Sequence, residues 1–325
     1  PVTEPEPISK PAATSPREPS SVHRRRRGAV PPISRATLYA LLGVVVVSFG
    51  LNWPVMAAGV RHISPLWLGV FRVGSAMVVF MVMAAARGQL RVPPRGDWPI
   101  VASIAVFGLA AVNYLVFTAL QIVPPGRSSV ITWTTPLWAV PIAAVFLGDR
   151  MTPRRWVGLA LGIGGVVVLF EPWGLDWGDH NVIVGHVMLL LDAFINASTS
   201  VHIRGHRWTI TPLDALPWQL AGSTVILMAV ALLTEGAPQI EWTPLLVGNV
   251  AYQGLLVSGV ALWAQIVIFR NVDPVSANLT MMGVPAIGVA SSAVFAGETI
   301  TLEVSLGLVL IVTGVAVNLL SERRH

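Results

Sequence analysis

Cysteine is absent from this chain of 325 residues, and charged side chains make up only 11% of it. Without cysteine the chain can form neither a disulfide framework nor a thiolate metal site, and its seven histidines show no spacing typical of zinc ligands. The phosphate-binding pattern GxxxxGK followed by Ser or Thr is also missing, which argues against ATP hydrolysis. We therefore expect no metal and no cofactor.

Apolar side chains are in excess, because hydrophobic residues form 54% of the sequence. A soluble core of this length cannot enclose so much apolar surface, so the composition predicts an integral membrane protein. About 20 apolar residues in a helix cross a hydrocarbon core of ~30 Å. We expect an all-α fold of ten transmembrane helices, over residues 37–60, 63–86, 98–123, 127–147, 154–170, 183–203, 212–234, 244–269, 275–296 and 302–320.

The basic residues are distributed unequally between the loops that these helices would leave on the two sides. An even number of helices puts both termini on one side, and 18 of the 21 Lys and Arg residues then fall on that side. The other side holds Arg61 and Arg127, and Arg72 lies within a helix. Because loops rich in Lys and Arg stay in the cytoplasm, we expect both termini to be cytoplasmic.

Residues 1–35 show no apolar periodicity and are rich in Pro, Ser, Glu and Arg, so we expect a disordered tail. Its arginine cluster, 24–27, precedes the first apolar segment, where basic residues orient a helix and contact anionic lipid. This placement favours the lipid bilayer over nucleic acid as the partner. The apolar stretch that follows is longer than the core of a signal peptide, which has about 7–15 residues.

The chain repeats itself at an offset of 149 residues. Pro136 then aligns with Pro285, residues 144–146 align with 293–295, and residues 148–149 align with 297–298. Hydrophobicity alone does not dictate glycine and proline, so this register indicates two halves of five helices each. Since five is odd, the second half crosses the membrane in the opposite sense, as in the inverted repeats of secondary transporters.

Proline in the middle of the fourth and ninth predicted helices removes a backbone hydrogen bond and can kink the helix. The freed carbonyl group is tolerated only inside protein or beside water. We expect Pro136 and Pro285 to act as hinges beside a central pathway. A plain packing kink is the alternative, since proline is frequent in membrane helices.

The run TTPLWAVPIAAVFLGDRMTPRRWVGLALGIGGVVVLF resembles the first-repeat signature of EamA-type transporters, which belong to the drug/metabolite transporter superfamily. The run from Met282 to Leu320 is similar to the second-repeat signature, and the segments SFGLNWPVM and SPLWLGVFRVG also fit the family. We therefore expect a first repeat over 36–171, a periplasmic loop over 172–182, a second repeat over 183–321 and a cytoplasmic tail over 322–325.

The resemblance also implies a multi-pass carrier of the bacterial inner membrane, whose cavity is lined by helices one, three, four, six, eight and nine. Carriers of this family often export amino acids, other metabolites or toxic compounds. We therefore expect an alternating-access exporter of a small-molecule substrate and not an enzyme. A flippase for lipids or lipid-linked sugars, or a channel, is the alternative; proton coupling and a homodimer stay open.

Asp192 is the one acidic residue well inside a predicted helix, in the segment LLLDAFINAS, where the family commonly has Trp or Tyr. Asn196 and Thr199 follow four and seven residues later and share its helix face. A carboxylate at membrane depth is costly, so Asp192 is a candidate for proton coupling or for holding an amine. A hydrogen-bonded structural role is the alternative.

Other polar and aromatic side chains lie on the helices assigned to the cavity. These candidates are Asn52, Trp53, Tyr114, Trp133, Thr134, Trp263, Gln265 and Asn278. Lipid-facing packing is the alternative for each, because Trp and Tyr also populate membrane interfaces. Arg72 is a candidate for pairing with Asp192 or for a structural role. His186 and His202 are expected to be structural, although His186 could join a proton path.

Overall fold

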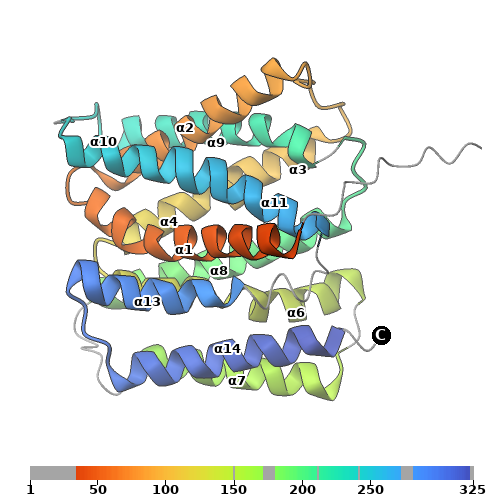
Figure 1. Ribbon diagram of the computed structural model, residues 1–325, viewed down its shortest axis with the longest axis vertical. Coiled ribbons are helices and arrows are strands. Elements are labelled where there is room, and N and C mark those ends of the chain that lie inside the picture. Colours follow the sequence, from red (N-terminus) through yellow and green to blue (C-terminus); the bar gives the residue numbers. More distant parts are fainter. Residues whose placement is uncertain are drawn as a thin grey trace, which may run out of the picture. The chain divides into compact units, whose positions relative to one another are not determined.

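The computed structural model describes residues 34–148, 151–170, 180–210, 212–240, 242–271 and 281–322, and every regular element in these ranges is a helix (Figure 1). The predicted basic tail, most of the loop at 172–182 and the candidate Asn278 lie outside the described residues.

The first half of the chain has three uninterrupted helices, and two of its predicted spans are divided into shorter pieces. The uninterrupted helices are α1 (Arg35–Gly59), α2 (Pro65–Ala86) and α7 (Pro153–Phe170). Between α2 and α7 lie α3 (Trp98–Ser103), the π-helix η1 (Ile104–Ala111), α4 (Val112–Ala119), α5 (Pro125–Thr132) and α6 (Thr135–Leu147).

The second half follows a similar order. Its uninterrupted helices are α8 (His180–Gly205), α9 (Pro212–Thr234) and α14 (Leu302–Glu322). Between α9 and α14 lie α10 (Pro244–Ala251), the π-helix η2 (Tyr252–Ala261), α11 (Leu262–Asn271) and α13 (Gly283–Ala296).

Seven helical segments of the described chain are long and apolar enough to cross a membrane. They are α1, α2, α8, most of α9, and the continuous runs α3–η1–α4, α5–α6 and α10–η2 with the start of α11. Shorter apolar segments lie in α13 and α14. The described part of the chain is therefore all-helical and has the apolar segments of a multi-pass membrane protein.

Side-chain caps and glycines set several helix ends. Ser34 and Thr243 cap α1 and α10, because each hydroxyl oxygen accepts the backbone N–H three residues further on. Gly148 and Gly297 end α6 and α13 with φ angles of 71° and 68°, a left-handed conformation that glycine adopts without steric penalty. These two glycines are aligned in the sequence repeat, so the same turn ends both helices.

Helices α7 and α14 lie side by side and approach through glycine (Figure 1). A Cβ atom added at Gly165 would lie 2.9 Å from the carbonyl oxygen of Gly307, and one at Gly314 would lie 2.5 Å from that of Gly158. Small residues at such contacts let membrane helices pack closely. The other main helix pairs are α1 with α13, α2 with α9, and α6 with α8.

A buried carboxylate joins the start of α3 to the connection between α8 and α9. Asp97 has 1% of its surface exposed and accepts a hydrogen bond from the Thr209 hydroxyl. It also accepts the backbone N–H groups of Thr209 and Ile210, both at 3.2 Å. The His206 ring lies 3.1 Å from the same carboxylate. The Thr209 hydroxyl, His206 and the two N–H groups outweigh burial and hold the pKa of Asp97 below its ordinary value.

Candidate functional site

The fourth predicted helix is broken between α5 and α6, directly before Pro136. Pro136 has no N–H to donate to the carbonyl group of Thr132, four residues earlier. The Thr135 hydroxyl donates to that carbonyl instead, at 2.8 Å, and the Thr134 hydroxyl caps the preceding carbonyl at 2.7 Å. The Thr-Thr-Pro sequence therefore breaks the helix and also supplies the hydrogen bonds that the break removes.

A second break lies at the start of α13, where Met282 precedes the helix and Pro285 is its third residue. Trp133 and Pro136 from the first break and Met282 and Pro285 from the second line one cavity of about 30 Å³. Three apolar side chains of α14 complete its wall. The structure thus brings the two predicted hinge prolines together, around a space too small for a solute.

Asp192 lies on α8 with none of its surface exposed. The Asn196 amide donates to Oδ1 at 2.9 Å, while the buried Oδ2 has no hydrogen-bond partner among the described residues. The Thr132 hydroxyl, at the end of α5, faces this carboxylate without reaching normal hydrogen-bond geometry. A buried carboxylate with one unsatisfied oxygen can hold a proton or accept an amine.

Arg72 lies on α2, and its charge interacts with that of Asp192. Its Nη1 atom lies 3.0 Å from the Met56 sulfur, and its guanidinium carbon lies 5.7 Å from the centre of the Phe117 ring. In the described part of the chain Arg72 and Asp192 form no direct ion pair. Because thioether and aromatic groups are weak partners for a cation, Arg72 keeps donors for another acceptor.

The remaining candidates differ in exposure. Asn52 and Trp53 are buried on α1, and Asn52 Oδ1 has no hydrogen-bond partner in the described structure. Gln265 is half-buried. Tyr114 and Trp263, which the repeat aligns with each other, are 40% and 45% exposed. The structure therefore does not gather all the candidates around one space.

The two helical histidines have different surroundings. His186 is buried, and its Nδ1 lies 2.8 Å from the carbonyl oxygen of Val182. His202 is exposed, and its Nδ1 lies 3.3 Å from the Ser103 hydroxyl oxygen. His186, six residues before Asp192, is the nearer of the two to the buried carboxylate along α8.

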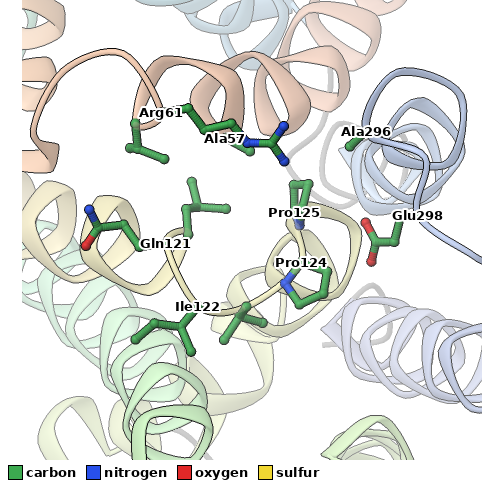
Figure 2. Close-up of a pocket in the computed structure, with 11 residues that line it drawn as sticks. Ala57, Arg61, Gln121, Ile122, Pro124, Pro125, Ala296 and Glu298 are labelled. Atoms are coloured by element: carbon green, nitrogen blue, oxygen red, sulfur yellow. The ribbon is translucent and has the colours of Figure 1, made fainter.

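A cavity of about 530 Å³ lies between the end of α1, the connection from α4 to α5 and the end of α13 (Figure 2). Arg61 and Glu298 stand on opposite walls, and Gln121 lies on the rim. Glu298 accepts the backbone N–H groups of Gly126, at 2.8 Å, and Arg127, at 3.3 Å. Gly126 permits this approach, because a Cβ atom there would lie 2.8 Å from the carboxylate oxygen.

Sequence reasoning treated Arg61 and Glu298 only as loop charges and missed this cavity. The available signal was the alignment of Glu298 with Asp149 after a shared glycine turn. Its partner segment precedes it by 172 residues, and no local pattern reports such a contact. Asp149 lies outside the described residues.

Comparison with known proteins places this helical arrangement in a family. The profile of the "EamA-like transporter family" matches residues 36–171 and 183–320. The transporter YoaV of Bacillus subtilis, named as uncharacterized, is 24% identical over 288 residues, covering 88% of this chain and 98% of that protein. A "probable amino-acid metabolite efflux pump" of Salmonella typhimurium is 26% identical over 292 residues, covering 86% and 94%.

A further relative and a solved structure are also similar to the chain. The uncharacterized inner membrane transporter YedA of Escherichia coli K12 is 26% identical over 268 residues, covering 81% of this chain and 84% of that protein. A crystal structure with 20% sequence identity matches the fold with a TM-score of 0.62, covering 90% of this chain and 99% of the other. The chain belongs to the EamA-like transporter family.

Proposed function

We propose that the protein is a secondary transporter of the bacterial cytoplasmic membrane, an alternating-access exporter of small metabolites such as amino acids. The names of relatives support this: one is a probable amino-acid metabolite efflux pump and another an inner membrane transporter. With both termini in the cytoplasm, the 530 Å³ cavity opens toward the outside.

The observation that carries the proposal is the meeting of the two broken helices. Pro136 and Pro285 line one small cavity, so a rotation at both breaks would widen or narrow the same space. Such discontinuous helices, paired by a repeat, surround the substrate site in many secondary transporters. A channel would need no matched breaks of this kind.

An inverted repeat accounts for several further matches at the 149-residue offset. The π-helix η1, moved by 149 residues, falls on 253–260, inside η2. The break at Trp133 falls on Met282, and the contact of α7 with α14 joins two equivalent helices. The contacts of α1 with α13 and of α6 with α8 are also equivalent under the same exchange of halves.

The repeat also supports ten membrane crossings. The helices α7, α13 and α14 are not among the seven long apolar segments, and these three helices complete the two sets of five. In this arrangement each half supplies one broken helix, one helix with a π-helical segment and three uninterrupted helices.

Proton coupling through Asp192 is the subsidiary proposal. Asp192 is buried beside Thr132, the last residue before the first break, so a change at the break alters the surroundings of the carboxylate. Its unsatisfied Oδ2 can exchange a proton for a substrate amine as the pathway opens.

The test is flux in proteoliposomes for labelled amino acids and amines, with and without an imposed pH gradient. We expect gradient-driven flux in the native protein and its loss in Asp192→Asn, because the amide cannot release a proton at any working pH. Asp214→Asn, at the start of α9, is the matched control and should keep native flux.

Two outcomes would contradict parts of the proposal. Unchanged flux in Asp192→Asn would make Asp192 a structural residue while leaving the carrier function in place. Absence of flux for every solute, with transbilayer movement of labelled lipids, would replace the metabolite carrier with a flippase.

A further inference from the structure

The 530 Å³ cavity presents a positive and a negative group to the same space. Arg61 extends from the end of α1, and within the described residues it forms no ion pair. Glu298 stands across from it at the end of α13 (Figure 2). The volume lies within the range of about 300–1,000 Å³ that is typical of small-molecule sites.

The Glu298 carboxylate is held in place by the N-terminus of α5. Its two oxygens accept the N–H groups of Gly126 and Arg127, which fixes the orientation of the carboxylate. Two acceptor positions remain, since a carboxylate has about four. A cationic group in the cavity can therefore bind Glu298 without displacing the helix contact.

Buried polar atoms lie one helical turn below the floor of the cavity on the same three helices. The floor includes Ala57 of α1, Pro125 of α5 and Ala296 of α13. Inward from these residues, Asn52, Ser129 and Ser292 are each no more than 3% exposed. Each has a side-chain oxygen without a hydrogen-bond partner among the described residues. A buried polar group without a hydrogen-bond partner destabilises the fold, and such a group can bind a polar solute that enters between the helices.

We propose that this cavity is an outer binding site for a zwitterionic amino acid at the end of a polar route toward Asp192. The Arg61 guanidinium binds the carboxylate of the ligand with two parallel hydrogen bonds, and Glu298 accepts its ammonium group. The inference rests on the proposed carrier function, because it names the substrate class that the carrier takes.

The test is binding to the full chain in detergent, measured by calorimetry with a panel of the standard L-amino acids. For the tightest ligand, its decarboxylated amine and its deaminated acid are measured in parallel. We expect both analogues to bind about tenfold or more weakly, since each lacks one charged partner. Arg61→Gln should weaken binding of the amino acid by a similar factor, and Arg61→Lys should weaken it less.

His62→Gln is the matched control, because His62 is exposed beside Arg61 and does not line the cavity. Arg61 is itself exposed, so its replacement leaves the helix packing intact. Three results would each overturn the site: no amino acid binds, the amine analogue binds as tightly as the amino acid, or Arg61→Gln keeps the native affinity. Flux of another solute would still support the carrier, whereas binding without flux would retain the site and reject the carrier.

Discussion

Proline in a membrane helix leaves one carbonyl group without a backbone donor, and a hydroxyl side chain lies within hydrogen-bond distance of that carbonyl at two of the prolines. The Ser291 hydroxyl shares its proton between the carbonyl freed by Pro54, at 3.3 Å, and that of Gly288, at 3.1 Å. Thr135 donates to the carbonyl freed by Pro136, at 2.8 Å. Val284 occupies the position equivalent to Thr135, so the break before α13 has no such hydroxyl of its own. The two breaks are equivalent in position and different in chemistry.

The lowered pKa of Asp97 makes the stability of the fold depend on pH. Because its pKa in the folded protein is lower than in the unfolded chain, its contribution to stability is present above about pH 4. It is lost as the pH falls through the lowered pKa. Asp97→Asn should therefore melt at a lower temperature than the native protein at pH 7, and the difference should shrink as the pH falls below about 4.

Thermal unfolding in detergent, followed by circular dichroism from pH 7 to pH 3, measures this difference. His206 is the other titratable group that faces the carboxylate, so His206→Gln is measured in parallel. A difference in melting temperature between the native protein and Asp97→Asn that stays constant across this pH range would contradict the lowered pKa of Asp97.

At the scale of helices, the contact between α7 and α14 depends on which face of α7 each glycine occupies. Gly165 meets backbone atoms of α14, whereas the adjacent Gly164 has no atom within 4 Å of an added Cβ. Gly165→Ala should destabilise the fold by about 1–3 kcal/mol through overpacking. Gly164→Ala should stabilise it by about 0.5–1 kcal/mol, because alanine favours the helix.

Unfolding by a denaturing detergent compares the two variants with the native protein. Both variants add the same methyl group to neighbouring positions of one helix, so they differ in the face of α7 that carries it. Equal stability of the two variants would reject the close approach of α7 and α14.

The sequence predicts the apolar segments and the place of the first break well, since hydrophobicity and proline act locally. It does not predict η1 and η2, each of which lies against a helix that is distant in the sequence. Gly108 in η1 approaches Thr199 of α8, and Gly254 in η2 approaches Ser75 of α2. The contact of Glu298 with α5 escaped prediction for the same reason.

At the scale of the molecule, carboxylates join the two halves at both ends of the bundle. Asp97, before α3, binds the connection from α8 to α9, and Glu298, after α13, binds the start of α5. Between them lies the small cavity at the two breaks. In the proposed alternating access, these end contacts open in turn as rotation at the two breaks widens the central space for the solute.

The chain has no cysteine, so pairs of introduced cysteines can carry spin labels without further changes. One pair, His62→Cys with Thr299→Cys, spans the cavity end; the other, Phe146→Cys with Arg207→Cys, spans the ends of α6 and α8. All four positions are exposed. Double electron–electron resonance in lipid nanodiscs at pH 8 and pH 5 then measures the distance between the two spin labels of each pair. Alternating access predicts that one distance lengthens as the other shortens; two distances that stay fixed, or that change in the same sense, would contradict it.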